Sequence, residues 1–191
     1  MLSSLRHRVV FILDQLALGF HRLGLTPNSS TVLGLVFAVA AGFLLYSRVS
    51  DLLTFWVAPL LVLISGFFDM IDGSLARMSQ RATKYGGVLD STLDRLGEIF
   101  ILSGIILGGL SSLSWGLVAI SASLMVSYVR ARSEVEGVRM SGVGIAERPE
   151  RMLVLVAALL LRSIEYGIIL IGVLSCVTVV QRLLHAYRSL R

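Results

Sequence analysis

The sequence predicts an all-α integral membrane protein with six transmembrane helices and an N-terminal interfacial amphipathic helix. Hydrophobic residues make up 55% of the 191 residues, and the mean hydropathy is +0.85. Charged residues make up only 15%, against about 25% in soluble domains. Six stretches are long and apolar enough to span a membrane, and the basic residues gather on one side of them. This composition excludes a soluble globular domain. It also leaves too little soluble surface for a nucleic-acid-binding protein, despite the net charge of +5.

The expected elements form a single domain over residues 1–191. Residues 1–22 mix charged residues with Leu, Val and Phe at helical spacing, which is typical of a helix lying in the interface. A helix needs about 20 mostly apolar residues to cross the hydrocarbon core. The six spans are expected near 32–47, 52–71, 91–111, 113–130, 146–162 and 166–183. The fifth has the shortest apolar run, and residues 142–146 can extend it upstream.

The distribution of Lys and Arg predicts the orientation of the spans. Six spans place both termini and the connections 72–95 and 131–151 on one side of the membrane. Every Lys and Arg lies in these segments or at the adjoining span ends, except Arg48 and Arg162. The positive-inside rule makes this side the cytoplasm. We therefore expect a multi-pass protein of the cell (plasma) membrane, with the active site and both termini cytoplasmic.

Four of the 12 acidic residues lie at the cytoplasmic ends of the second and third spans. They are Asp69, Asp72, Asp90 and Asp94. Their spacings, i to i+3 and i to i+4, place each pair on one face of a helix. Four carboxylates at a membrane edge repel one another and resist desolvation, which divalent cations offset. Oxygen ligands without His or Cys favour Mg²⁺, Mn²⁺ or Ca²⁺ over zinc and copper. The alternative is that the acids are solvated or paired with nearby arginines.

The connection between these two spans has a fixed pattern of acidic and small residues. It reads Asp69-x-x-Asp72-Gly73-x-x-Ala76-Arg77, then eight residues, Gly86, three residues, Asp90, three residues and Asp94. This pattern resembles, without a departure, the motif of the CDP-alcohol phosphotransferases. The resemblance implies a six-helix bundle, usually a homodimer, over essentially the whole chain. It also implies an enzyme that binds a CDP-activated lipid and two divalent ions, Mg²⁺ or Mn²⁺. A hydroxyl of the acceptor alcohol then attacks the lipid-side phosphorus, and CMP leaves.

The resemblance also assigns roles to single residues. Asp69, Asp72 and Asp90 are the implied metal ligands. Asp94 is the implied general base, which takes the acceptor's proton, and it is also a candidate metal ligand. The implied CDP-lipid contacts are Asn28, Thr31, Asp69, Asp72, Gly73, Ala76, Arg77 and Thr83. For the turn that contains Asn28, the alternative is that Pro27 and Asn28 only start the first span, as a helix cap.

Arginines at the cytoplasmic ends of the last three spans predict an acceptor that carries a phosphate, because guanidinium groups present rigid paired donors. They are Arg130, Arg148, Arg151 and Arg182. Their segments, SYVRARSE and GIAERPERM, are similar to segments in the inositol-phosphate branch of the family, the phosphatidylinositol-phosphate and archaetidylinositol-phosphate synthases. That similarity implies an inositol phosphate acceptor. The GIAER form favours CDP-archaeol over CDP-diacylglycerol as the lipid donor.

Two other functions are consistent with parts of this pattern. Glycerol 3-phosphate as the acceptor would keep the same chemistry, since it also carries a phosphate. An ion transporter would also place acids in membrane helices. The chain shows no internal repeat, however, and its acids lie at one edge of the membrane rather than at its centre.

Overall fold

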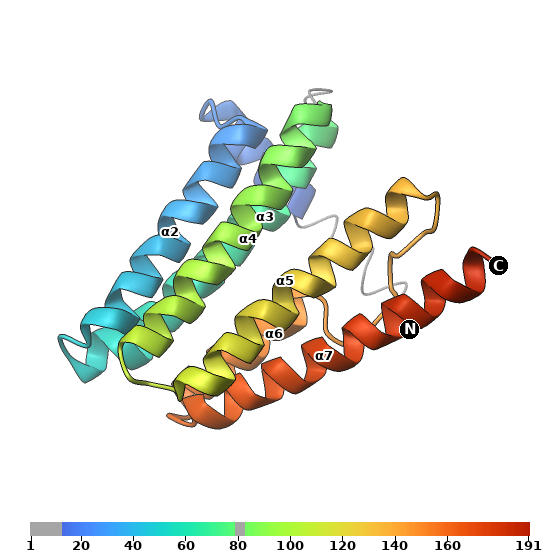
Figure 1. The fold of residues 1–191 in the computed structure, drawn as a ribbon. Helices are drawn as coiled ribbons and strands as arrows, with labels where there is room; N and C mark the ends of the chain where they lie inside the picture. Colours follow the sequence, from blue (N-terminus) through green and yellow to red (C-terminus); the bar gives the residue numbers. More distant parts are fainter. Residues whose placement is uncertain (1–12, 79–82) are drawn as a thin grey trace, which may run out of the picture.

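The computed structural model describes residues 13–78 and 83–191, and within these ranges the chain forms helices and no strand (Figure 1). The labelled elements are α2 (Pro27–Ser47), the π-helical turn η1 (Leu53–Val57), α3 (Ala58–Met78), α4 (Lys84–Leu107), α5 (Leu113–Val135), α6 (Arg148–Leu160) and α7 (Ile164–Ser189). The all-α prediction is therefore confirmed. Residues 13–22 form a further helical segment, and the rest of the expected interfacial helix, residues 1–12, lies outside the described residues.

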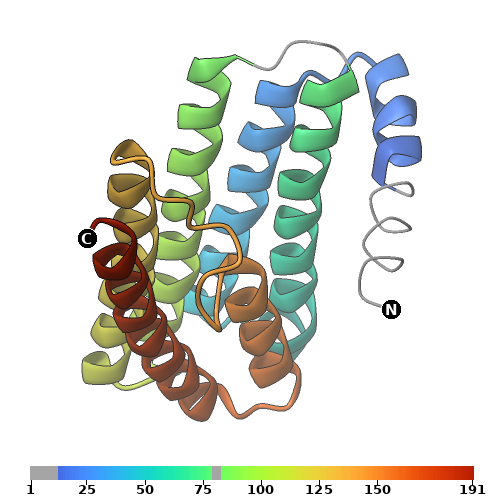
Figure 2. The ribbon, with the colours of Figure 1, turned by 90° about the vertical axis from the view of Figure 1, so that its right-hand side faces the viewer.

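The helices lie in two groups, which Figures 1 and 2 show from two sides. In the first group α2 packs against both α3 and α4, and in the second α5 packs against α7. The short helix α6 joins the groups, because it packs against α7 on one side and α3 on the other. One apolar core runs through both groups and includes Leu45, Ile101, Leu155 and Ile168, each almost fully buried.

The first span begins at Pro27, five residues earlier than expected. Thr26 is the N-cap: its hydroxyl accepts a hydrogen bond from the Ser29 backbone N–H at 3.2 Å, and the Thr26 N–H donates to the Ser29 hydroxyl at 2.9 Å. Together with Pro27 in the first turn, this capping box fixes the helix start. The expected cap is therefore present, but Thr26 supplies it, and Asn28 lies inside the helix with an exposed side chain.

Two glycines bring α2 and α4 into close backbone contact. A Cβ atom on Gly104 would overlap the carbonyl oxygen of Gly42, so neither position can carry a side chain at this distance. A Cβ on Gly97, two turns earlier, would lie 3.0 Å from the Ala38 Cβ. Small residues at such crossings allow the close packing that stabilises helix pairs in membranes. The crossing therefore fixes α4, which carries Asp90 and Asp94, against α2.

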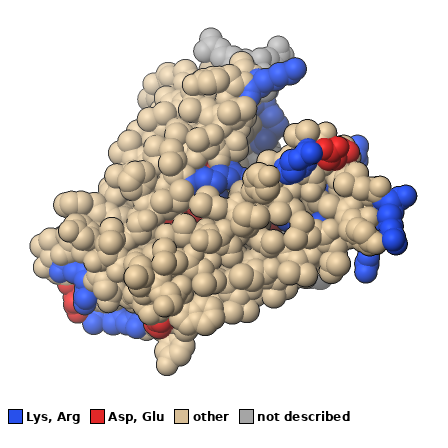
Figure 3. All heavy atoms as spheres, viewed as in Figure 1, with Lys and Arg blue, Asp and Glu red and all other residues tan. Residues whose placement is uncertain are grey.

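Within the described residues, four helices are long and apolar enough to cross a membrane. They are Pro27–Ser47, Leu53–Met78, Leu113–Val135 and Ile164–Ser189. In Figure 3 the charged side chains gather toward the ends of the molecule, and most of the surface between them carries no charge. The chain is thus a multi-pass helical membrane protein. The other two expected spans correspond to α4, which carries charged residues in its first half, and to α6.

Helix α6 has 13 residues and is therefore about 20 Å long, shorter than the hydrocarbon core of about 30 Å. The expectation that residues 142–146 extend this helix upstream is wrong. Gly142 and Gly144 have φ angles of +75° and +112°, which a right-handed helix does not contain. The helix instead begins at Arg148, with Pro149 in its first turn.

Candidate active site

A cavity of about 730 Å³ lies between the two helix groups, at the end that carries the acidic motif. Its charged lining comes from helices that are far apart in the sequence. It includes Asp69 of α3, Asp90 and Asp94 of α4, Arg130 of α5, Arg148 and Arg151 of α6, and Arg182 of α7. Blue and red atoms are visible in the hollow between the groups in Figure 3. The fold thus gathers three of the four motif aspartates and all four predicted arginines around one space.

The fourth aspartate, Asp72, lies behind the cavity wall. It is 6% exposed, and the Thr31 hydroxyl of α2 donates a hydrogen bond to its Oδ2 at 2.7 Å. The Asp72 and Asp90 carboxyls are close enough across α3 and α4 to interact electrostatically. The two acidic pairs therefore face each other, one from each helix. Thr31, expected to contact the nucleotide, is itself 4% exposed and contacts Asp72.

Asp69 and Asp94 hold a guanidinium between them. Arg148 Nη1 forms an ion pair with Asp69 Oδ2, and it lies 2.7 Å from Asp94 Oδ1. All three side chains are largely buried, with 16–20% of their surface exposed. Asp94 Oδ1 and Arg148 Nε are the buried side-chain atoms that lack a hydrogen-bond partner in the described part of the chain. The Arg148 charge therefore offsets the repulsion between carboxylates that the sequence pattern predicts.

The chemistry of these residues fits a divalent cation. All the ligating atoms on offer are carboxylate oxygens, as Mg²⁺ and Mn²⁺ prefer, and one of them, Asp94 Oδ1, makes no hydrogen bond. As the side chains are arranged, no three His, Cys, Asp or Glu side chains in residues 13–78 and 83–191 converge into a coordination shell. Arg148 lies among them instead.

The residues expected to contact the nucleotide gather near the ends of α2, α3 and α4. Thr83 is the N-cap of α4, and its hydroxyl accepts a hydrogen bond from the Gly86 N–H at 2.9 Å. A Cβ on Gly86 would lie 3.0 Å from that hydroxyl and 3.4 Å from Asn28 Oδ1, so Gly86 keeps this corner compact. Arg77 is 61% exposed and donates to the Ser74 hydroxyl at 2.8 Å. Gly73 and Ala76 lie half-buried on α3 beside it.

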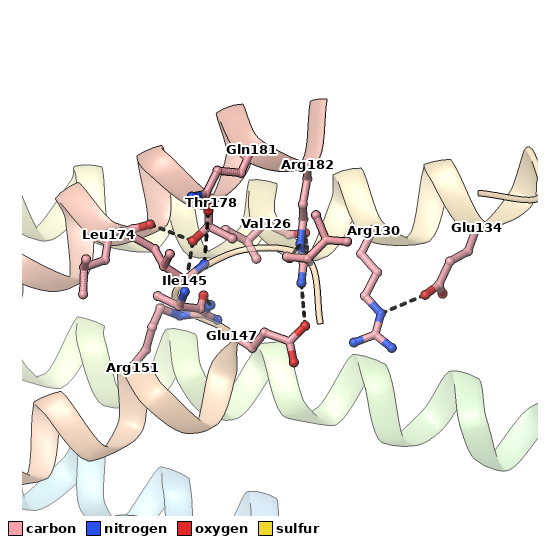
Figure 4. A network of polar contacts seen from close by, with 12 residues as sticks. Val126, Arg130, Glu134, Ile145, Glu147, Arg151, Leu174, Thr178, Gln181 and Arg182 are labelled. Atoms are coloured by element: carbon pink, nitrogen blue, oxygen red, sulfur yellow. Dashed lines mark hydrogen bonds and ion pairs between the residues drawn. The ribbon is translucent and has the colours of Figure 1, made fainter. Parts of the chain in front are cut away.

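The four predicted arginines differ in how far their guanidiniums are already engaged. Arg130 is 41% exposed and pairs with Glu134 on its own helix at 3.0 Å. Arg182 is 2% exposed, and its three nitrogens donate to the Val143 carbonyl, the Val126 carbonyl and Glu147 at 2.7–2.9 Å (Figure 4). Arg130, 41% exposed, and Arg148, 20% exposed, are thus more accessible than Arg182.

Arg151 is 1% exposed and belongs to a buried ion pair. Its Nε and Nη2 donate to the two carboxylate oxygens of Glu98 at 2.8 and 2.9 Å, and its Nη1 donates to the Ala146 carbonyl at 3.1 Å. The sequence reasoning did not select Glu98. Its spacing could have revealed it, because Asp90, Asp94 and Glu98 recur every four residues and so share one face of α4.

Comparison with known sequences gives a consistent result. The family model described as CDP-alcohol phosphatidyltransferase matches residues 24–181. Archaetidylinositol phosphate synthase of Pyrococcus horikoshii is 36% identical over 190 residues, which cover 100% of this chain and 98% of that protein. The synthase of the same description from Methanothermobacter thermautotrophicus is 37% identical, with coverage of 100% and 96%. Phosphatidylinositol phosphate synthase of Mycobacteroides abscessus is 32% identical, with coverage of 98% and 90%.

Solved structures of Mycobacterium tuberculosis phosphatidylinositol phosphate synthase (PgsA1) share the fold. The complex with manganese and citrate superposes with a TM-score of 0.78 at 29% identity, covering 92% of this chain and 88% of that one. The form with CDP-DAG bound gives a TM-score of 0.77 at 30% identity, with coverage of 92% and 94%.

Proposed function

This chain belongs to the CDP-alcohol phosphatidyltransferase family, and on that basis we propose that it transfers a lipid phosphate group from a CDP-activated lipid to inositol phosphate. A hydroxyl oxygen of the acceptor forms a bond to the lipid-side phosphorus, the bond from that phosphorus to CMP breaks, and CMP leaves with the bonding electrons. The observation that carries this proposal is that one cavity is lined by carboxylates from α3 and α4 and by arginines from α5, α6 and α7.

The carboxylates serve the transfer step. Asp94, a carboxylate that lines the cavity, takes the proton of the attacking hydroxyl. Thr31 orients Asp72 by donating to Oδ2, and Asp90 faces it from α4. With Asp69 these residues would hold Mg²⁺ or Mn²⁺, which supplies positive charge to the diphosphate and to the departing CMP. Manganese in the Mycobacterium tuberculosis synthase structure supports this choice of ion.

The remaining motif residues bind the donor. Asn28, Thr83 and Gly86 form a compact polar corner at the ends of α2 and α4, and Gly73, Ala76 and Arg77 lie on the adjoining end of α3. We assign the cytidine and phosphate groups of the CDP-lipid to this region. The two archaeal relatives, both described as archaetidylinositol phosphate synthases, favour CDP-archaeol as the donor.

The arginines that line the cavity bind the phosphate of the acceptor. Arg148 Nε is buried at the cavity without a hydrogen-bond partner in the described residues, and Arg130 faces the same space from α5. Both can donate to a phosphate oxygen, and a charge-assisted bond of this kind is stronger than a neutral one. Arg182 and Arg151 line the same cavity, each with three of its five N–H groups bonded within the protein, and they support the loop and helix that carry Arg148.

The membrane arrangement completes the proposal. We propose that the four apolar helices, together with α4 and the short helix α6, form a six-span bundle. The amphipathic pattern of residues 1–22 supports an interfacial position for that segment. The excess of Lys and Arg on the side of the acidic motif supports a cytoplasmic position for the active site and both termini. Residues 1–191 act as one domain, and two copies form a homodimer, as the family resemblance implies.

The test is product formation by the purified protein in detergent with Mg²⁺ or Mn²⁺. CDP-archaeol and CDP-diacylglycerol are each offered with inositol phosphate or glycerol 3-phosphate, and lipid product and CMP release are measured. We expect product with inositol phosphate and none with glycerol 3-phosphate. Product with glycerol 3-phosphate alone would keep the transfer chemistry and overturn the acceptor. No product with either, from folded protein with metal present, would overturn the proposed reaction.

A further inference from the structure

The buried pair between Glu98 and Arg151 is an interaction that the transfer reaction itself does not use. Glu98 is 3% exposed and Arg151 is 1% exposed, and two parallel hydrogen bonds join them at 2.8 and 2.9 Å. A carboxylate and a guanidinium in this bidentate geometry satisfy each other's charge. Removal of one partner would leave the other charge buried without compensation. The contact between α4 and α6 at this pair is therefore stable only when both charged side chains are present.

The pair lies one helical turn below the active-site contact between the same two helices. Glu98 follows Asp94 by four residues on α4, and Arg151 follows Arg148 by three residues on α6. Each spacing places the two side chains on one face of their helix. The contacts between α4 and α6 thus form two layers, with Arg148 and Asp94 at the cavity and Arg151 and Glu98 beneath them. The backbone of α6 packs mainly against α7 and α3, and these two ion pairs are polar contacts that join it to α4.

Arg151 also holds the loop that precedes α6. Its Nη1 donates to the Ala146 carbonyl at 3.1 Å, while the Ala146 N–H donates to the Thr178 hydroxyl of α7 at 3.1 Å. The neighbouring Ile145 N–H donates to Gln181 of α7 at 3.1 Å. Figure 4 shows these contacts from α7 converging on the loop, with Arg151 below them. Arg151 therefore fixes both the start of α6 and the loop that leads into it.

Arg151 uses three of its five N–H groups within the protein and is 1% exposed, whereas Arg148 Nε has no hydrogen-bond partner in the described residues. We propose that Glu98 is a positioning residue for the acceptor site: by holding Arg151, it fixes the first turn of α6 and keeps the Arg148 guanidinium in the cavity. This inference rests on the proposed function only in that Arg148 binds the acceptor's phosphate.

The test compares four variants in the full-length protein: Glu98→Gln, Arg151→Gln, the double variant Glu98→Gln/Arg151→Gln, and Arg148→Gln. Affinity for inorganic phosphate is measured by calorimetry on the metal-loaded protein, and thermal unfolding is followed in the same detergent. The Michaelis constants for inositol phosphate and CDP-lipid are measured in parallel. Inorganic phosphate is the probe because it does not depend on which phosphorylated acceptor the enzyme uses.

We expect Glu98→Gln and Arg151→Gln each to weaken phosphate binding about tenfold and to lower the unfolding temperature, since each leaves a buried group badly paired. The double variant should recover most of both, because two amides of similar shape can hydrogen-bond without a net charge. Arg148→Gln should weaken phosphate binding, and no change at residue 98 should rescue it. In the active variants the Michaelis constant for inositol phosphate should rise far more than the Michaelis constant for CDP-lipid.

Recovered stability in the double variant with phosphate binding as weak as in Arg151→Gln would show that Arg151 contacts phosphate itself, and would overturn the proposal. Wild-type phosphate affinity in Glu98→Gln would also overturn it. If the double variant does not fold, Glu98→Asp keeps the charge but shortens the side chain. It should fold and bind phosphate several-fold more weakly, and wild-type affinity would overturn the proposal. An enzyme without turnover on inositol phosphate would contradict the proposed function, while the phosphate affinities would still test Glu98.

Discussion

Arg148 Nη1 lies 2.7 Å from Asp94 Oδ1, so the first turn of α6 contributes a positive charge to the acidic cluster that α3 and α4 form. The same nitrogen pairs with Asp69, so the Arg148 guanidinium of α6 contacts both α3 and α4. Two carboxylates that would serve a divalent cation are thus partly neutralised by the chain's own residue. Arg148 and the cation therefore compete for the carboxylate oxygens of Asp69 and Asp94.

The first prediction concerns this competition. Arg148→Gln should bind Mn²⁺ about threefold or more tightly than wild type, because the cation no longer displaces a guanidinium from Asp69 and Asp94. Mn²⁺ affinity can be measured by electron paramagnetic resonance of the free ion. Arg130→Gln is the matched control, since Arg130 pairs with Glu134 and not with the motif aspartates. Equal or weaker Mn²⁺ affinity in Arg148→Gln would contradict the idea.

The second prediction tests the proton acceptor. Asp94→Asn should lower turnover by about 10²–10⁴-fold, the range for loss of a general base, while CDP-lipid still binds. Turnover is measured by CMP release, and donor binding by calorimetry. Glu134→Gln, which removes an acid of the same cavity from the exposed pair with Arg130, serves as the comparison for general electrostatic effects. Turnover near the wild-type rate in Asp94→Asn would remove Asp94 from the role.

The third prediction concerns Thr31, whose hydroxyl donates to the buried Asp72 carboxyl. Thr31→Val removes the 2.7 Å hydrogen bond to the buried Asp72 carboxyl and should lower the free energy of unfolding by about 1–3 kcal/mol. Thr31→Ser retains the hydroxyl and should stay close to wild type. Unfolding by a denaturing detergent gives both values. If Val and Ser behave alike, the hydroxyl does not support Asp72.

The fourth prediction addresses the crossing of α2 and α4. Gly104→Ala places a Cβ against the Gly42 carbonyl and should lower the free energy of unfolding by about 1–3 kcal/mol, the usual effect of overpacking. Gly66→Ala is the control, because a Cβ there meets no atom within 4 Å. It should leave stability unchanged or raise it slightly, since alanine has the higher helix propensity. Equal effects at the two positions would mean that the close crossing does not limit packing.

Local patterns in the sequence predict much of this structure. Apolar length finds every helix, and the spacing of Asp69, Asp72, Asp90 and Asp94 predicts two facing pairs, which α3 and α4 form. The burial of Arg151 in an ion pair could not be predicted in this way. Its partner, Glu98, lies 53 residues earlier, and only the packing of α6 brings the two together. Apolar content also does not predict where α6 begins, because it does not reveal that Gly142 and Gly144 have positive φ angles.

The shortness of α6 has a consequence for how the two substrates meet. A 13-residue helix covers only part of the depth of the bilayer, and a non-helical loop, whose Val143 and Ala146 carbonyls accept hydrogen bonds from Arg182 and Arg151, leads into its start. The charged cavity lies beside this start of the helix. A sugar phosphate dissolved in water and a nucleotide anchored by lipid tails can react there, and neither has to leave its own solvent.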